Sequence, residues 1–162
     1  MYYIYDDNNE IVDKSNAFDD SRLQMFSTKD ILLDKLALFD GEIYDIDDIE
    51  YWRLRRTKEL NEYCIAMENG SYMADGILMD CNEKSVTKLS LGLQMYQINN
   101  TPDDYIVNVV DYNNNINQMP LSEFKEIAKS VGSEYSNRYL LKWTNREKLK
   151  SNDIDIVKSI LF

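Results

Sequence analysis

The chain has 162 residues, of which 44% are hydrophobic, and it contains 12 Tyr, 5 Phe and 2 Trp but only 5 Gly and 2 Pro. This composition is sufficient for one α+β domain with its own core, and it argues against a flexible linker or a disordered chain. The apolar runs fall well short of the ~20 residues that span a bilayer, and no signal peptide or lipidation motif is visible. We therefore expect no contact with membranes.

The formal charge of −11 is unevenly distributed along the chain. Residues 1–50 hold 14 acidic and 4 basic side chains, a net charge of −10, whereas residues 51–162 hold 15 and 14, a net charge of −1. A negative field repels phosphates and favours basic protein surfaces, so we expect no direct binding of nucleic acid. The plainer interpretation is that these carboxylates solvate turns and strand edges.

Two hairpins are predicted in the acidic part of the chain, residues 1–50. Residues 2–5 form an aromatic strand, residues 6–9 a polar turn and residues 10–12 a returning strand. Asp40-Gly41 lies between apolar stretches, and this dipeptide is a strong signal for a two-residue hairpin turn.

The middle of the chain predicts two helices separated by a hairpin. Apolar residues recur at spacings of three and four over residues 48–69, which is typical of an amphipathic helix. Asp75-Gly76 predicts a short hairpin after it. Asn82 is expected to cap the next helix, which runs to about Met95.

The last third predicts a hairpin and two more helices. Residues 105–119 contain two apolar runs around an Asn-rich turn. Ser122 is expected to cap the longest helix, whose apolar stripe reaches Trp143, so Trp143→Ala should cost roughly 3–5 kcal/mol. Ser151 is expected to begin a short closing helix. Because hairpins give antiparallel strands, the predicted class is α+β, with antiparallel hairpins packed with three to four helices and a long C-terminal helix.

The residues do not indicate an enzyme. The chain has no His, which removes the commonest general base and metal ligand, and its glycines form no phosphate-binding loop. The acidic residues 40–50 could hold a hard cation, but they lack the spacing of a calcium-binding loop. We therefore expect no cofactor, no metal and no catalytic residues.

The two cysteines and a short basic segment each have a structural interpretation and a functional one. Cys64 and Cys81 have no companion His or Cys cluster, so we expect reduced, packed thiols. Residues 52–56 are basic and aromatic and could contact nucleic acid or a protein partner. We favour pairing of Arg53 and Arg56 with glutamates on the same helix.

A characteristic order of features extends over residues 36–162. In chain order these are Phe39-Asp40-Gly41, the basic helix at 53–60, the hairpin around Tyr72, Asp80 before a helix, Asp111 to Asn114 after a strand, Leu121 to Phe124, Tyr139 to Trp143 and Ile154 to Val157. This order resembles an uncharacterised domain family found in the tail-fibre and tail-assembly modules of phages and prophages. The resemblance covers about three quarters of the chain. It implies a phage tail-associated domain without assigned catalytic residues.

The limits of this resemblance predict two parts. Residues 1–35 lie outside it. Residues 1–36 are predicted to be an acidic and aromatic hairpin module that acts as an adaptor, while residues 37–162 form the phage tail-associated α+β domain. The aromatic residues of the module could add an edge strand or ring faces to a neighbour, or could cover the core of the domain itself. The predicted partner-contact residues are Tyr2, Tyr3, Tyr5, Asp6 and Asp7.

The resemblance implies a non-enzymatic structural or adaptor protein of a bacteriophage tail, baseplate or fibre. Such a protein is made in the cytoplasm of the host bacterium, resides in the virion tail and docks on tail or fibre proteins, in several copies around the tail axis. One alternative is an acidic inhibitor that uses residues 6–50 to occupy the basic groove of a host defence nuclease in place of nucleic acid. Another is a chaperone of tail-fibre assembly.

Overall fold

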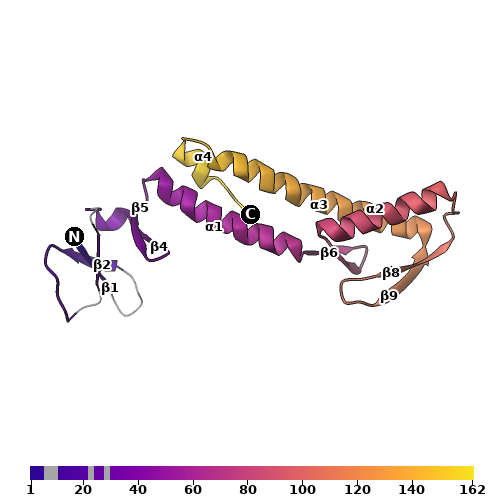
Figure 1. Cartoon of the computed structure of the whole chain (residues 1–162), viewed down its shortest axis with the longest axis horizontal. Coiled ribbons are helices and arrows are strands. Elements are labelled where there is room, and N and C mark those ends of the chain that lie inside the picture. The colour runs from indigo at the N-terminus through magenta and orange to yellow at the C-terminus, as the bar shows by residue number, and fades with distance from the viewer. Residues whose placement is uncertain (6–10, 22–23, 28–29) are drawn as a thin grey trace. The chain divides into compact units, whose positions relative to one another are not determined.

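The computed structural model describes residues 1–5, 11–21, 24–27 and 30–162 (Figure 1). Its elements are β1 (Tyr2–Tyr5), β2 (Ile11–Ser15), β3 (Gln24–Phe26), the 3₁₀ helix η1 (Leu33–Lys35), β4 (Leu36–Phe39), β5 (Glu42–Asp45), α1 (Ile49–Glu68), β6 (Ser71–Ala74), β7 (Ile77–Asp80), α2 (Glu83–Ile98), β8 (Ile106–Val110), β9 (Ile116–Pro120), α3 (Leu121–Leu149) and α4 (Ile154–Lys158).

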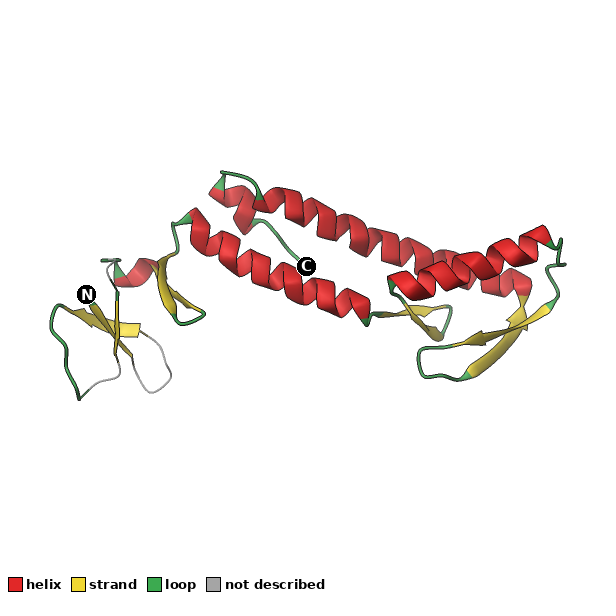
Figure 2. Cartoon of the chain, in the orientation of Figure 1, coloured by secondary structure: helices red, strands yellow, loops and turns green. Residues whose placement is uncertain are grey.

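All described strand pairs are antiparallel, and α3 is the longest described helix with 29 residues (Figure 2). The predicted α+β class, with hairpins and a long C-terminal helix, is therefore confirmed. Among the described helices, none combines the length and apolar character that a membrane crossing requires.

The chain forms two compact units. The first unit comprises Met1–Lys58 and Lys148–Ile160, and the second comprises Glu59–Glu147 and Leu161–Phe162. These units differ from the parts predicted at residues 1–36 and 37–162, because the first unit extends along α1 and includes α4.

The first unit contains a three-stranded sheet in which β1 lies between β2 and β3. The antiparallel pairing of β1 with β2 confirms the strands of the first predicted hairpin, while its turn at residues 6–9 lies outside the described residues. The sequence did not predict β3, since three residues are too few to display the two-residue alternation of a strand.

Tyr3 lies at the centre of a small apolar cluster in the first unit. The side chain is completely buried with Ile31 and Ile43, and its hydroxyl accepts a hydrogen bond from the Ile31 N–H at 2.8 Å. Ile31 precedes the boundary predicted after residue 36 and Ile43 follows it, so one cluster joins residues on both sides of that boundary. The boundary itself stays a prediction.

The two Asp-Gly turns are confirmed as hairpin turns. Asp40 and Gly41 have φ angles of +48° and +82°, and Asp75 and Gly76 have φ angles of +50° and +79°. Positive φ at both central residues is the type I′ geometry, whose twist matches that of the flanking strands. Each turn therefore sets the register of its hairpin, β4–β5 and β6–β7.

Two arginines of α1 hold the C-terminal part of the first unit. A guanidinium nitrogen of Arg53 donates to the Ser151 carbonyl at 2.8 Å, and one of Arg56 donates to the Lys158 carbonyl at 2.9 Å. Lys158 ends α4, where carbonyls have no partner within the helix. The predicted pairing of Arg53 with its own helix is also present, since Arg53 lies 3.5 Å from Glu50.

The core of the second unit is formed by the hairpins β6–β7 and β8–β9 together with α3. In β8, Val107 and Val109 are buried while Ile106 and Val110 are exposed, as expected of a sheet with one face on the core. The predicted apolar face of α2 lies partly buried against this core. The buried residues are Ala74, Met79, Cys81, Val107, Val109, Met119, Leu121, Phe124, Ile127, Ala128 and Val131.

The two cysteines have different environments. Cys64 is half-buried and Cys81 is completely buried, and both are free thiols. The Cys81 thiol lies 3.7 Å from the Val131 carbonyl, and burial raises its pKa.

The predicted caps of α2 and α4 have different outcomes. Asn82 caps α2 as predicted, because its side-chain oxygen accepts from the Ser85 N–H at 2.9 Å. The prediction for Ser151 is wrong, since α4 begins at residue 154 and its cap is Asp153. The carboxylate of Asp153 accepts from the Asp155 N–H at 2.9 Å.

The predicted cap of α3 is also wrong. Ser122 lies inside the helix, which begins at Leu121 directly after β9. The N–H groups of Leu121 and Ser122 donate to the carbonyls of Tyr105 at 2.8 Å and Asp103 at 3.0 Å. Backbone carbonyls of the preceding loop thus accept hydrogen bonds from N–H groups at the start of the helix. A capping side chain would otherwise accept these bonds.

The apolar stripe of α3 does not reach Trp143, whose residue surface is 46% exposed. At 100° per residue, Trp143 lies ~160° around the helix from the buried Ile127, whereas Asn145 lies five whole turns from it. Asn145 is indeed buried, and its side-chain amide donates to the Leu161 carbonyl at 2.7 Å. A polar residue continues the stripe, so the apolar pattern alone gave the wrong position.

The assigned phase of α3, meaning which of its faces is buried, can be tested by the free energy of unfolding of substituted chains. We expect Ile127→Ala to cost about 2–5 kcal/mol, because it removes packed methyl groups from a fully buried site. Trp143→Ala should cost less than about 1 kcal/mol, because the indole is half exposed. Urea unfolding measures both, and a larger loss for Trp143→Ala than for Ile127→Ala would contradict the assigned phase.

Substitutions at two glycines test the described packing around Gly70 and Gly92. A Cβ on Gly70 would lie 2.8 Å from a guanidinium nitrogen of Arg138 and 3.1 Å from the Cys81 carbonyl oxygen, whereas a Cβ on Gly92 in α2 would meet nothing within 4 Å. Gly70→Ala should therefore destabilise the protein by about 1–3 kcal/mol, and Gly92→Ala should stabilise it by about 0.5–1 kcal/mol. Thermal or urea unfolding checks both signs. A neutral Gly70→Ala would show that the backbone approach at this residue is looser than described.

Candidate functional site

The structure separates the five predicted partner-contact residues. Tyr3 is completely buried, so its ring serves the core of the first unit rather than a partner. Tyr5 is half-buried, and burial raises the pKa of its phenol. Asp6 and Asp7 lie outside the described residues. Tyr2 is partly exposed and has aromatic neighbours at the surface.

Tyr2, Phe18 and Phe26 form a cluster that we call the aromatic patch. The centroid of the Tyr2 ring lies 5.2 Å from that of Phe26 and 5.6 Å from that of Phe18, in tilted and edge-to-face geometry. Phe18 is 65% exposed and Phe26 is 59% exposed. When a partner binds, aromatic residues that are this exposed can bury a large apolar area.

The strand pairing and local turns position the aromatic patch. Phe26 stands directly opposite Tyr2 in the β1–β3 pair, so their side chains share a face of the sheet. Phe18 lies in the segment after β2, where the Ser15 hydroxyl accepts from the Ala17 N–H at 3.1 Å. Sequence reasoning missed Phe18 because it stands among polar residues after β2, and missed Phe26 because β3 is only three residues long. The available signal for Phe18 was an aromatic residue in a polar segment.

Several carboxylates of the acidic segment are already paired within the first unit. These pairs are Lys14–Asp30 at 2.6 Å, Lys35–Asp47 at 2.6 Å, Lys58–Asp40 at 2.7 Å and Arg53–Glu50 at 3.5 Å. The hydrogen bond between Lys35 and Asp47 lowers the pKa of Asp47 and raises that of Lys35. In the described part of the chain, no group of three or more Cys, Asp and Glu side chains is arranged to hold a metal ion.

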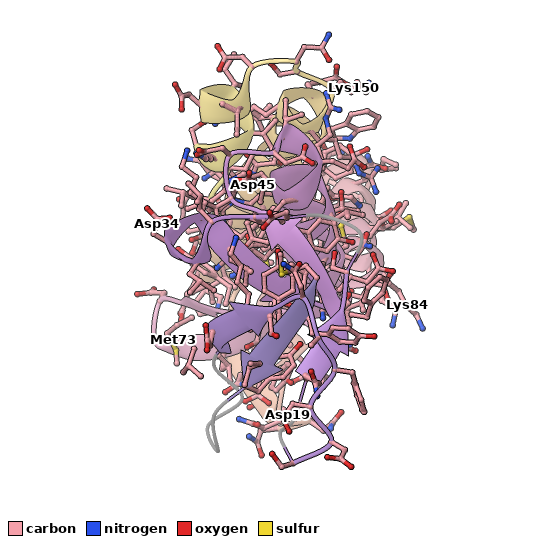
Figure 3. The ribbon with its side chains drawn as sticks, turned by 90° about the vertical axis from the view of Figure 1, so that its left-hand side faces the viewer. Asp19, Asp34, Asp45, Met73, Lys84 and Lys150 are labelled. Atoms are coloured by element: carbon pink, nitrogen blue, oxygen red, sulfur yellow. The ribbon has the colours of Figure 1, made fainter. Side chains whose placement is uncertain are left out.

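The remaining negative charge is not gathered at one point of the first unit. Figure 3 labels Asp19, Asp34 and Asp45, and their side chains project at separate places around the ribbon. The acidic segment therefore presents several dispersed carboxylates and, separately, the uncharged aromatic patch.

The second unit contains a cavity of about 410 Å³ lined by residues of β7, α2, β8 and α3. Asp80 and Lys88 contribute charged groups to it, and Ser85 contributes a hydroxyl. The lining residues include no His or Cys, so this hydroxyl has no imidazole or thiolate beside it within the cavity. The cavity thus lacks the pairing of nucleophile and histidine base that many hydrolases use.

Asp111 borders this cavity and organises the turn between β8 and β9. Its carboxylate accepts from the backbone N–H groups of Asn113 at 2.9 Å and Asn115 at 2.8 Å. It also accepts from the side-chain amides of Asn115 at 3.1 Å and Asn117 at 3.3 Å. These hydrogen bonds, with the Asn115 backbone as the largest contribution, lower the pKa of Asp111. The role of this carboxylate is to hold the turn.

The Asp111 interactions predict a pH dependence of stability. Because its pKa is lower in the folded chain, its contribution is fully present above the unfolded value of ~3.9 and is lost as the pH falls through the folded value. Asp111→Asn should therefore flatten the fall in melting temperature below pH ~4, whereas the exposed control Asp104→Asn should not. Thermal unfolding from pH ~6 to ~2.5 compares the slopes, and equal slopes in both variants would contradict the assignment.

Residues of α3 form a second aromatic surface, which we call the α3 ridge. Tyr135, Tyr139 and Trp143 follow one another at four-residue spacing, with ring centroids 6.2 and 6.3 Å apart. Tyr139 and Trp143 are exposed, whereas Tyr135 is partly buried against the core of the second unit. The Lys142 ammonium lies 5.8 Å from the Tyr139 ring centroid, and the Arg146 guanidinium lies 5.9 Å from that of Trp143. These distances are those of cation–π interactions, so the ridge combines apolar faces with positive charge.

The hairpin β8–β9 has a third exposed surface. Ile106, Val110 and Ile116 project away from the core, and Val110 stands directly opposite Ile116. Neither strand contains a charged residue. Charges are a common protection of strand edges against pairing with another chain, so this hairpin is also available for contact.

The fold and these surfaces define an α+β protein with several exposed aromatic and aliphatic surfaces suited to macromolecular contact. Comparisons with models of protein families, with curated proteins and with solved structures found no match.

Proposed function

We propose that the chain is a non-enzymatic structural or adaptor protein of a bacteriophage tail, baseplate or fibre, and that it works by docking on other tail or fibre proteins. The observation that carries the docking function is the aromatic patch, in which the Tyr2 ring lies beside the exposed rings of Phe18 and Phe26 in the first unit. The assignment to a tail is supported by the resemblance of residues 36–162 to the phage tail-associated family.

The physical character of the aromatic patch favours a protein partner. The rings of Tyr2 and Phe26 lie beside each other across the β1–β3 pair, which reduces the side-chain freedom that they lose on binding. Complete burial of a Phe side chain contributes roughly 1.5–3 kcal/mol, and aromatic residues are frequent at the centres of protein interfaces. Phe18 and Phe26 could therefore supply much of the affinity for a partner.

The arrangement of the carboxylates favours docking over inhibition of a nuclease. An acidic inhibitor needs free carboxylates to stand in for phosphates, but Asp30, Asp40 and Asp47 each lie within 2.7 Å of a lysine of the same unit. Labelled carboxylates also project at separate places in Figure 3. These pairs leave less negative charge for a basic groove than the net charge of residues 1–50 suggests.

A structural part and an assembly chaperone differ mainly in whether the chain stays in the finished particle. Quantitative mass spectrometry of purified tail particles separates them. We expect the chain in stoichiometric amounts, and its absence from finished particles would favour the chaperone.

The docking role predicts the effect of substitutions in the aromatic patch. The double variant Phe18→Ser/Phe26→Ser should keep its fold, because both rings are exposed, and should bind purified tail particles at least about 30-fold more weakly. Tyr105→Ser is a matched control, since Tyr105 is an exposed aromatic residue of the second unit. Circular dichroism checks the fold, and co-sedimentation with the particles measures binding.

Salt distinguishes docking from charge mimicry in the same assay. Binding through aromatic burial should change little between low and near-molar salt, because screening does not act on apolar contacts. Unchanged binding by the Phe18→Ser/Phe26→Ser variant would contradict the role of the patch. Loss of binding by orders of magnitude with salt, together with binding to a nuclease, would support the acidic inhibitor instead.

A further inference from the structure

The α3 ridge combines features that the proposed docking through the aromatic patch does not use. Tyr139 and Trp143 are exposed and in contact, and each ring has a cation beside it. Neither Lys142 nor Arg146 is in an ion pair with any residue that the structure describes. By contrast, Arg138 on the same helix is paired with Glu134 at 2.7 Å. The ridge therefore presents unneutralised positive charge on an aromatic surface.

The same chain also carries dispersed carboxylates in the segments around the β4–β5 hairpin. Asp34, Glu42, Asp45 and Asp48 lie within 15 residues of one another and form no ion pair within the described ranges. Figure 3 shows the side chains of Asp34 and Asp45 at the surface of the first unit. Residues 1–50 as a whole have a net charge of −10, whereas residues 138–150 hold five basic residues and one acidic residue.

We propose that the α3 ridge of one copy binds the acidic β4–β5 region of a second copy. Charge complementarity between these two regions of the same chain identifies the occupant. The two surfaces are different, so the contact is heterologous, and repeated contacts of this kind form rings or open filaments. This inference goes beyond the proposed function, because it concerns contact between copies and requires no tail protein.

Aromatic and basic residues together can also bind nucleic acid, but this chain itself supplies carboxylates that match the charge of the ridge. The net charge of −11 disfavours nucleic acid and a second copy alike, so the choice of a second copy depends on the local charges of the two regions. A second copy instead provides carboxylates for Lys142 and Arg146, and backbone and aliphatic groups against which Tyr139 and Trp143 can be buried.

The first experiment is sedimentation velocity of the purified full-length chain across a range of concentrations at low and high salt. We expect reversible association into dimers and larger species at low salt. The association constant should fall on the order of tenfold or more between about 0.05 M and 0.5 M salt, because exposed charge pairs are screened.

Charge reversal on the ridge tests the site. Lys142→Glu/Arg146→Glu should be monomeric at concentrations where the wild-type chain associates. Lys84→Glu/Lys88→Glu is the matched control, because it changes the net charge by the same amount at two exposed lysines of α2, and it should still associate. These side chains lie at or near the surface, so circular dichroism should show an unchanged fold.

Reciprocal reversal tests the partner surface. Asp34→Lys/Glu42→Lys should also be monomeric alone, since it reduces the net charge of residues 34–48 from −5 to −1 and places two lysines opposite the basic ridge. An equimolar mixture of this variant with Lys142→Glu/Arg146→Glu should regain a 1:1 complex, because the new carboxylates at positions 142 and 146 of one copy can pair with the new lysines of the other.

A wild-type chain that stays monomeric at low salt would overturn this inference, as would a mixture of the two variants that fails to associate. Loss of association in the Lys84→Glu/Lys88→Glu control would show that net charge rather than the ridge is responsible. Tight binding of a fluorescent single-stranded oligonucleotide that is lost in Lys142→Glu/Arg146→Glu would assign the ridge to nucleic acid. None of these results bears on docking through Phe18 and Phe26, which the particle assay tests separately.

Discussion

The angular step of α3 determines which of its side chains enter the core and which reach solvent. A helix that advances 100° per residue can bury only one stripe against the hairpins of the second unit. In α3 that stripe contains Phe124, Ile127 and Val131 and is continued by Asn145. The same geometry directs Trp143 to solvent, so the core of the second unit and the exposed α3 ridge are two consequences of one helical phase.

The sequence predicted the secondary structure best where the signal was local. Asp40-Gly41 and Asp75-Gly76 adopt the positive φ angles that define their turns, and Asn82 caps α2. The predictions failed where a distant backbone group took over a local role. The carbonyls of Tyr105 and Asp103 bind the first N–H groups of α3, and nothing in the sequence around Ser122 indicates these partners.

The candidate site was less predictable than the fold. The aromatic character of residues 2–5 identified Tyr2, but the same pattern could not show that Tyr3 is buried. Phe18 and Phe26 reach Tyr2 only because β3 pairs with β1, and a three-residue strand has no detectable periodicity. The two exposed surfaces also differ in character, since the aromatic patch consists of uncharged side chains while the α3 ridge carries cations over its rings. One chain can in this way use apolar burial toward one partner and charge toward another.

The environment of Cys81 makes it a natural reporter of motion in the core of the second unit. Its thiol is completely buried, lies near the Val131 carbonyl and has a raised pKa. The thiolate is the form of cysteine that attacks alkylating reagents, and the reagent must reach the sulfur. Modification of Cys81 under native conditions therefore requires the hairpins and α3 to separate, whereas the half-buried Cys64 is covered less completely. The rate at which Cys81 is labelled consequently measures how often this core opens.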